Sequence, residues 1–195
     1  RTRIELRPRL RDTRFAYRVL DVPASSHPTV AAALARVAAP TADDVAWDPF
    51  VGAGTELVEL SKRCPDCTLL GSDLDERALR AARANLSLAG LDDARIWRAD
   101  ALQAHPTSPS LIVTNPPMGQ RVRLERPIAE FLVEALRHFA SVLRPGGRIV
   151  WLSPKPRETH EAARSLGLRN ELERAVDLGG FDASCRSFTS PERAP

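Results

Sequence analysis

The chain has 195 residues, of which 43% are hydrophobic, and a formal net charge of +3. This length suits one domain with a good-sized core, and no apolar stretch approaches the roughly 20 residues that a membrane-spanning helix needs. No signal-peptide pattern opens the sequence, so we expect a soluble, cytoplasmic protein with no membrane partner. The chain begins with Arg1 rather than Met, which leaves room for a preceding region that supplies part of the function.

Arginines are concentrated in two parts of the sequence. The first cluster surrounds Phe15 and Tyr17 and consists of Arg1, Arg3, Arg7, Arg9, Arg11, Arg14 and Arg18; the second consists of Arg121, Arg123 and Arg126. Arginines beside aromatic residues suit phosphate contacts and base stacking, although a solvated arginine-rich surface has the same composition. The mild positive charge therefore permits nucleic-acid binding without requiring it.

Helical and strand patterns alternate along most of the chain. Residues 1–26 have weak periodicity and are predicted to form a basic arm, an irregular strand pair or the remnant of a preceding region, followed by one domain over 27–195. Helices are expected at 27–40, 55–63, 75–90, 128–143 and 157–167, and strands at 44–50, 67–73, 94–100, 110–115 and 147–154, with 172–178 and 182–189 as a final antiparallel pair. This order predicts an α/β fold, a Rossmann-like seven-stranded and mostly parallel sheet with helices on both faces.

The three cysteines are too few for a disulfide framework. Two of them form the stretch CPDC at 64–67, whose spacing occurs in zinc and redox sites. Zinc needs two further ligands, and the sequence offers only Cys185 and scattered histidines. We therefore interpret CPDC as a loop between a helix and a strand, and we predict no metal site.

Ligands in such folds bind at the carboxyl ends of the strands, at the topological switch point of the sheet. The stretch DPFVGAGT at 48–55 follows the first strand, and Gly52 and Gly54 would let a ligand approach the backbone closely. Asp73 ends the next strand, about 20 residues later, where a carboxylate can accept hydrogen bonds from both hydroxyls of a ribose. Together these features predict a cofactor that contains adenosine.

The next two strand ends also carry polar loops. Asp100 follows the third strand, where it would meet an adenine amino group, and the stretch TNPPMG follows the fourth. Prolines remove backbone donors and fix φ, so the four residues Asn115, Pro116, Pro117 and Met118 are predicted to form a stiff, non-helical loop.

A nicotinamide dehydrogenase would share the glycine turn and the acidic residue. It would normally add a third glycine for the pyrophosphate, whereas here Gly54 is followed by TELVE. S-Adenosyl-L-methionine has no phosphate and needs no such glycine. The glycine pattern thus favours S-adenosyl-L-methionine over a dinucleotide.

The motifs in this order resemble the class I S-adenosylmethionine-dependent methyltransferases, specifically the amino-methyltransferases marked by (D/N/S)-P-P-(Y/F/W). DPFVGAGT is similar to the DPFCGSGT of THUMP-associated RNA guanine-N2 methyltransferases, and SDLDERALRAARANL and TNPPMG match the next motifs of that family. The resemblance covers residues 25–190 and includes no THUMP domain.

The resemblance implies that 27–195 is a catalytic domain that methylates an exocyclic amine of a base in structured RNA, most often N2 of guanine in tRNA or rRNA. Such an amine is a poor nucleophile, and acceptors aimed at its hydrogens favour the charge that develops on attack. The Asn115 side-chain oxygen and the Pro116 carbonyl would supply them, with Pro117 stiffening the turn. Met118 stands where the family usually has Tyr or Phe to stack on the extruded base, so we expect weaker stacking.

The implied cofactor site collects residues from four strand ends. It consists of Asp48, Phe50, Gly52, Gly54, Thr55, Asp73, Leu74, Asp100, Ala101 and Asn115, together with His27, Pro28 and Thr29 at a helix N-terminus that would approach the methionine carboxylate. Asp48 would orient the amino-acid end of the cofactor, although a strand-end aspartate can also cap a helix. Asp75 is predicted to be such a cap.

Three other functions remain open. An adenine-N6 DNA or RNA methyltransferase uses the same turn, and a protein-glutamine methyltransferase also uses N-P-P-Y but usually has D-x-G-T-G-S-G in its first loop. A weakly catalytic module that binds cofactor or RNA would fit Met118. In each RNA case a separate RNA-binding domain or partner is compatible with the chain.

Overall fold

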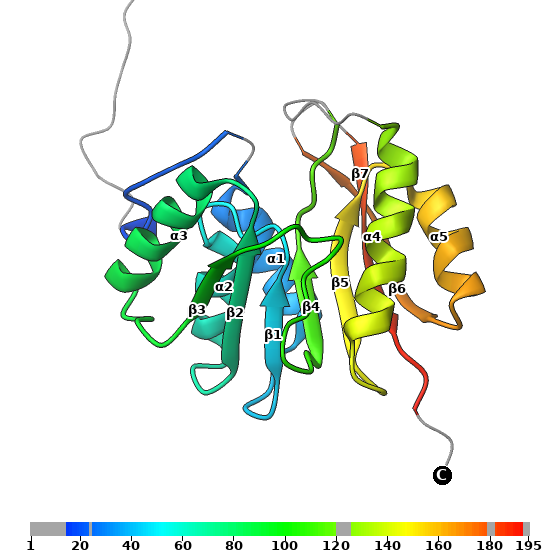
Figure 1. The fold of residues 1–195 in the computed structure, drawn as a ribbon, viewed down its shortest axis with the longest axis horizontal. Coiled ribbons are helices and arrows are strands. Elements are labelled where there is room, and N and C mark those ends of the chain that lie inside the picture. Colours follow the sequence, from blue (N-terminus) through cyan, green and yellow to red (C-terminus); the bar gives the residue numbers. More distant parts are fainter. Residues whose placement is uncertain (1–14, 24, 120–125, 179–181, 193–195) are drawn as a thin grey trace, which may run out of the picture.

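The computed structural model describes residues 15–23, 25–119, 126–178 and 182–192 of the chain. Within these ranges, seven strands form one sheet in the order β3-β2-β1-β4-β5-β7-β6, and helices cover both of its faces (Figure 1). The strands are β1 (Val45–Asp48), β2 (Thr68–Asp73), β3 (Arg95–Arg98), β4 (Leu111–Thr114), β5 (Arg148–Ser153), β6 (Arg169–Asp177) and β7 (Asp182–Thr189). The helices are α1 (Pro28–Ala38), α2 (Thr55–Arg63), α3 (Glu76–Leu88), α4 (Ile128–Val142) and α5 (Pro156–Ser165).

The predicted fold class is confirmed. The pairs β1–β2, β2–β3, β1–β4 and β4–β5 are parallel, and β7 is antiparallel to both β5 and β6. The chain runs outward from β1 to β3 and then returns to place β4 on the other side of β1. The switch point of the sheet, where such folds bind ligands, therefore lies between the carboxyl ends of β1 and β4.

Two hydrophobic cores lie on opposite faces of the sheet. Alternate residues of a strand point to opposite faces, so Ala46 packs with α1, α2 and α3, whereas the neighbouring Trp47 packs with α4 and α5. The same alternation separates Leu111 from Ile112 in β4. In Figure 1, α4 crosses in front of the sheet and α1 and α2 lie behind it. Because both faces are covered, a ligand can reach the sheet only at its strand ends.

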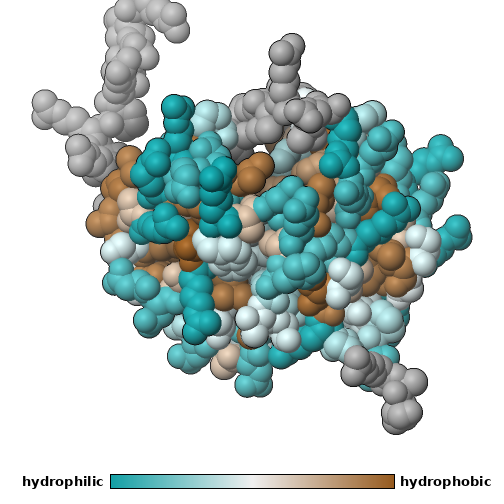
Figure 2. Space-filling view, in the orientation of Figure 1, coloured by the Kyte–Doolittle hydropathy of each residue, from teal (hydrophilic) through white to brown (hydrophobic). Residues whose placement is uncertain are grey.

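The surface is mixed in character. Hydrophilic side chains cover much of the face seen in Figure 2, with hydrophobic residues scattered between them. Among the described helices, none combines the length and the apolar character needed to cross a membrane.

Local sequence explains where the helices begin. Asp75 accepts a hydrogen bond from the Arg77 amide (2.8 Å) and caps α3, as predicted, and His27 Nδ1 accepts one from the Thr29 amide (3.3 Å) at the start of α1. Pro28 occupies the first turn of α1, where its missing N–H removes no helical hydrogen bond. The expected element boundaries agree with the observed ones to within a few residues.

The CPDC stretch is a loop between α2 and β2, as predicted. Cys67 is buried in the core on the α1–α3 face, and Cys64 packs against the same core. Burial raises the pKa of the Cys67 thiol to about 11, so it remains a neutral, protonated group. In the described part of the chain, no three potential metal ligands lie together. The two thiols serve packing.

The segment 15–23 does not form the irregular strand pair that was considered for residues 1–26. It crosses α2 and α3: Tyr17 is buried in the core and donates a 2.9 Å hydrogen bond to Glu59 of α2. The buried side chain of Asn85 in α3 accepts from the amides of Val19 and Leu20 (3.0 and 3.1 Å). The arginines at positions 1 to 14 of the predicted basic arm lie outside the described residues, as do Arg121 and Arg123.

Candidate active site

The site is centred on Asp48 at the switch point. Asp48 is the last residue of β1 and is fully buried. Its Oδ1 accepts hydrogen bonds from the Thr114 hydroxyl at the end of β4 (2.6 Å) and from the Phe50 amide (3.1 Å). Its Oδ2 is also buried, and no described residue donates to it. A buried carboxylate oxygen of this kind can receive a donor only from a ligand or water.

The glycine loop lies beside the second acidic residue. Gly52 and Gly54 have φ angles of 51° and 80°, in the left-handed region where glycine is favoured. This conformation lets the Gly52 amide donate a 3.0 Å hydrogen bond to Asp73 Oδ2, while Asp73 Oδ1 accepts from the Asp75 amide (3.0 Å). Each carboxylate oxygen has a further lone pair, so Asp73 is fixed in place and can still accept hydrogen bonds from two hydroxyls.

The acidic residues of the site have raised pKa values. Burial and the nearby carboxylate of Glu56 raise the pKa of Asp48 well above its usual range, and burial raises the pKa of Glu56 as well. Burial also raises the pKa of Asp73, although the amides of Asp75 and Gly52 oppose this effect. A positively charged ligand would favour the ionised forms of these groups.

The Asn-Pro-Pro turn forms the other wall of the site. Residues 115–119 follow β4 without helical or strand structure, as predicted. Asn115 Nδ2 donates a 2.9 Å hydrogen bond to the buried hydroxyl of Ser26, while Asn115 Oδ1 is buried and has no partner among the described residues. Pro116 is buried, and Met118 is half-buried against the core on the α1–α3 face. The Asn115 side chain thus has a free acceptor, Oδ1, while its Nδ2 is already hydrogen-bonded to Ser26.

A third unpartnered polar atom belongs to the same loop system. The hydroxyl of Thr55, the first residue of α2 after the glycine loop, is buried and without a hydrogen bond to any described residue. Buried polar atoms are nearly always hydrogen-bonded, so three such atoms on the loops at one edge of the sheet, from Asp48, Thr55 and Asn115, leave room there for a polar molecule.

The remaining residues predicted from β2 and β3 lie along one rim. The Ala99 amide donates to the Asp73 carbonyl (3.1 Å), which holds the ends of β2 and β3 together. Asp100 is half-buried, and its Oδ1 accepts from the Leu102 amide (2.9 Å). Ala101 is buried, whereas the Leu74 side chain is 60% exposed. Leu74 and Asp100 could therefore border a flat ring and its polar edge.

Two predicted groups have other contacts in this structure. The Phe50 ring packs against Phe131 and Phe139 (ring centroids 5.8 and 6.3 Å apart) on the α4 face, so only its backbone reaches Asp48. His27 uses Nδ1 to cap α1, beside the Thr29 hydroxyl (2.8 Å). Pro28 is buried and Thr29 is exposed next to it. The His27 side chain therefore caps the N-terminus of α1.

Sequence reasoning missed four residues of the site. Thr114 holds Asp48; Ser26 and Glu56 are hydrogen-bonded to each other beside Asn115. Asn85 donates to the Ala53 carbonyl in the glycine loop and to the Leu20 carbonyl (2.8 Å each), so it joins that loop to the segment 15–23. The sequence offered little signal for them, because Glu56 is one of two glutamates, with Glu59, that are buried in α2.

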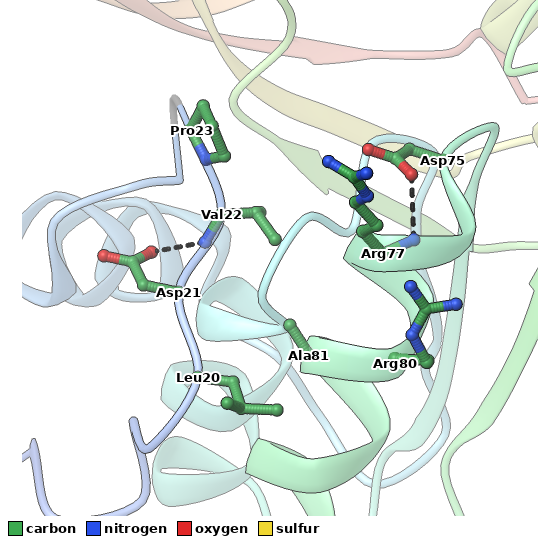
Figure 3. Close-up of a pocket in the computed structure, with 8 residues that line it drawn as sticks. All are labelled: Leu20, Asp21, Val22, Pro23, Asp75, Arg77, Arg80 and Ala81. Carbon is green, nitrogen blue, oxygen red and sulfur yellow. Dashed lines mark hydrogen bonds between the residues drawn. The ribbon is translucent and has the colours of Figure 1, made fainter.

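A surface hollow flanks the rim beside Asp75. It has a volume of about 410 Å³ and separates the segment 15–23 from the first turns of α3 (Figure 3). Its lining residues are Leu20, Asp21, Val22, Pro23, Asp75, Arg77, Arg80 and Ala81. None of the residues predicted to bind the cofactor or the target lines this hollow, so it adjoins the site without being part of it.

Known proteins resemble this chain in sequence and in fold. The family described as "RMKL-like, methyltransferase domain" matches residues 16–183. The tRNA (guanine(6)-N2)-methyltransferase of Thermus thermophilus is 32% identical over 156 residues, which make up 78% of this chain and 46% of that protein. The U6 snRNA (guanine-N(2))-methyltransferase THUMPD2 of Mus musculus is 33% identical over 139 residues, 68% of this chain and 25% of that protein.

The crystal structure of TrmN from Thermus thermophilus superimposes with a TM-score of 0.78 and 30% sequence identity, over 91% of this chain and 52% of that one. This chain therefore spans about half the length of the bacterial relative and a quarter of the mouse protein. The matches confirm the resemblance to RNA guanine-N2 methyltransferases that the motifs predicted.

Proposed function

The chain belongs to the family of RMKL-like methyltransferase domains, and from this premise we propose that it methylates N2 of a guanine in structured RNA, tRNA or rRNA, with S-adenosyl-L-methionine as the methyl donor. One observation carries the proposal. Asn115 Oδ1, on a stiff turn, and Asp48 Oδ2, at the adjacent strand end, are buried acceptors without partners among the described residues. The first suits an amine that is to be methylated, and the second suits the ammonium group of the donor.

The residues present fit the cofactor. Asp48 Oδ2 would accept a hydrogen bond from the α-amino group, and Asp73 would accept two from the ribose hydroxyls. Asp100 would accept one from the adenine amino group, with the exposed Leu74 against the ring face. Burial raises the pKa values of Asp48 and Asp73, and the positive charge of the sulfonium and the ammonium would favour the ionised forms of both groups.

The Asn-Pro-Pro turn would act on the target amine. The lone pair of an exocyclic amine is delocalised into the base, and the nitrogen must become tetrahedral and cationic as it is methylated. Asn115 Oδ1 and the Pro116 carbonyl would accept hydrogen bonds from its two hydrogens and so stabilise the developing charge. Bound S-adenosyl-L-methionine supplies the electrophilic methyl group. Holding the amine in line with it accounts for much of the remaining rate.

The target base would pack against Met118. Its thioether is apolar and polarisable but has no π face, so base stacking should be weaker than against Tyr or Phe. Recognition of the whole RNA is assigned to other parts: the arginine clusters, and a separate RNA-binding domain or partner protein.

The proposal can be tested by product identification. The protein would be incubated with methyl-labelled S-adenosyl-L-methionine and, separately, with unmodified tRNA, rRNA, DNA and protein extract, and the products digested and identified. Label in N2-methylguanosine is the expected result. Label in N6-methyladenine or in glutamine would replace the proposed target with an alternative. Cofactor binding without label in any pool would identify a non-catalytic module or a domain that requires its RNA-binding partner.

A further inference from the structure

We propose that Ser26 and Glu56 are positioning residues that orient the Asn115 side chain so that its oxygen, not its nitrogen, faces the target amine. The three side chains form one hydrogen-bonded chain, in which Asn115 Nδ2 donates to Ser26 Oγ (2.9 Å) and Ser26 Oγ donates to Glu56 Oε1. The proposal rests on the proposed function, because the orientation matters only if Asn115 accepts a hydrogen bond from a substrate.

The hydrogen bonds that link Asn115, Ser26 and Glu56 are shielded from water. Ser26 and Glu56 are only 6% and 4% exposed, so water competes little for their hydrogen bonds. They come from distant parts of the sequence: Ser26 precedes α1, Glu56 lies in the first turn of α2, and Asn115 follows β4. A polar link of this kind between three elements fixes the geometry of the turn more tightly than apolar packing could.

The number of donor hydrogens available to Ser26 and Glu56 determines which end of the Asn115 side-chain amide faces Ser26. An ionised Glu56 can only accept, so it takes the single hydroxyl hydrogen of Ser26. The Ser26 oxygen is then left with lone pairs alone, and it can bind Asn115 only through the amide nitrogen. The Asn115 oxygen must therefore point the other way, into the site, where it has no partner among the described residues.

Protonation of Glu56 would remove this constraint. A neutral Glu56 can donate to Ser26, which frees the hydroxyl hydrogen to bind the Asn115 oxygen and turn the amide nitrogen toward the substrate. Such a nitrogen cannot accept a hydrogen bond from an amine. Glu56 is faced by Asp48 at the end of β1 and by Glu59 on its own helix, whose charges oppose its ionisation, and by Arg18, which favours it.

The first test uses Ser26. Ser26→Ala should lower kcat by about 10-fold because the amide loses its orientation, while the Kd for S-adenosylhomocysteine should change by less than about twofold. Ser26→Thr keeps the hydroxyl and should restore most of kcat. Ser61→Ala is the matched control, since Ser61 is a buried serine of α2 whose hydroxyl, among the described residues, bonds only to the Val58 carbonyl within its helix (2.8 Å). An unchanged kcat in Ser26→Ala, or equal losses of kcat and cofactor affinity, would overturn the proposal.

The second test uses Glu56. Glu56→Gln keeps the shape of the side chain but permits either direction of the hydrogen-bonded chain, so kcat should fall by about fivefold at neutral pH and lose the decline toward low pH that Glu56 causes in the parent enzyme. Glu59→Gln is the same change in a buried glutamate of the same helix, which bonds to Tyr17 and Lys62 instead; because the charge of Glu59 opposes ionisation of Glu56, this variant should keep the decline in kcat and move it to lower pH. If both variants behave alike, Glu56 has no specific role.

A third measurement does not require RNA methylation. The side-chain NH2 signals of Asn115 can be assigned by their loss in Asn115→Ala and followed by two-dimensional ¹H–¹⁵N NMR. They should shift in Ser26→Ala and titrate with pH in the parent protein but not in Glu56→Gln. Signals that are insensitive to both changes would overturn the orientation, whatever the activity. The expected signals without methylated guanosine would instead leave the orientation standing and count against the proposed function.

Discussion

The hydroxyl of Thr114 donates a 2.6 Å hydrogen bond to Oδ1 of Asp48, and this bond joins the carboxyl ends of β4 and β1. Both side chains are fully buried. With the Phe50 amide on the same oxygen, the carboxylate is held so that only Oδ2 is available to a ligand. Burying the Asp48 carboxylate lowers the stability of the folded protein, and perturbed ionisable groups of this kind are typical of binding sites.

Asp48→Asn should therefore make the free protein more stable and weaken its cofactor binding. The pKa of Asp48 is raised in the folded chain, so its contribution to stability is present at low pH and is lost as pH rises through the folded-state pKa. Asparagine removes the charge but can still accept from Thr114. At pH 7.5 a gain of about 1 kcal/mol would raise the Tm by about 2–4 °C.

Calorimetry with and without S-adenosylhomocysteine measures both effects. The stabilisation by saturating ligand should fall by at least about 1.4 kcal/mol in Asp48→Asn, which corresponds to an affinity reduced by at least about 10-fold. The exposed residue Asp93 provides a control, since Asp93→Asn should alter neither quantity. A lower Tm together with unchanged affinity would show that Asp48 is a structural residue only.

Asp73→Ala and Asn115→Ala should separate cofactor binding from turnover. Asp73 is fixed by the Gly52 and Asp75 amides as an acceptor for the ribose, so its loss should weaken cofactor binding by about 10–100-fold. Asn115→Ala should reduce kcat by at least about 100-fold and leave cofactor affinity nearly intact, because the lost acceptor acts on the amine. Calorimetric Kd values and single-turnover rates decide the matter. If activity survives in both variants, the site has been assigned incorrectly.

The sequence predicted the parts of the site that lie within a short motif. Gly52, Gly54, Asp73 and the Asn-Pro-Pro turn could each be recognised from neighbouring residues, and the alternation of helices and strands brought their loops to one edge of the sheet. These features depend on local conformation, which short stretches of sequence encode directly.

The supporting contacts could not be predicted in this way. Ser26 and Asn115 are 89 positions apart, and Thr114 and Asp48 are 66 apart, so their contacts exist only once the strand order is set. Nor does a strand-end motif show that the Phe50 ring packs against Phe131. Such roles depend on three-dimensional packing rather than on local residue type.

Met118→Tyr should maintain or raise the rate of methyl transfer. Met118 is half-buried at the edge of the core, and a tyrosine ring there could stack on the extruded base. Stacking is worth about 1–3 kcal/mol per base in nucleic-acid sites, so an improvement of several-fold in kcat/KM for RNA is expected. Met118→Leu is the control that changes the side chain without adding a ring. A clear loss of activity in Met118→Tyr alone would mean that the pocket is shaped around methionine.

Asn85→Ala should remove the hydrogen bonds that join the glycine loop to the segment 15–23. Asn85 makes four hydrogen bonds to backbone groups of Val19, Leu20 and Ala53, and all of these groups would lose a partner. The free energy of unfolding should fall by about 2–4 kcal/mol, and limited proteolysis should cut the segment 15–23 faster. Arg83→Ala, an exposed change in the same helix, is the comparison. Equal proteolysis of the two variants would contradict the anchoring role.

Asp44→Asn should destabilise the protein more at neutral pH than in strong acid. Asp44 is buried at the opposite end of β1 from the active site, where Arg148 forms two hydrogen bonds to its carboxylate (2.8 and 3.1 Å) and Ser110 forms a third (2.6 Å). Despite the opposing effect of burial, these donors and the Thr41 amide hold the pKa of Asp44 well below its usual range. A depressed pKa contributes stability above the usual pKa near 4, and that contribution is lost as pH falls further.

The two aspartates of β1 therefore respond to pH in opposite directions. Removing the charge of Asp44 should cost about 1–3 kcal/mol at pH 7, since Arg148 is partly exposed and keeps some solvation, and the cost should shrink only as pH falls below the usual pKa near 4. Asp48→Asn should instead lose its stabilising effect in acid, where Asp48 is already protonated. Thermal unfolding of both variants from about pH 1.5 to pH 8 tests this contrast, with cofactor affinity of Asp44→Asn expected to match the parent. If the destabilisation by Asp44→Asn is the same at every pH, the ion pair with Arg148 is not its cause.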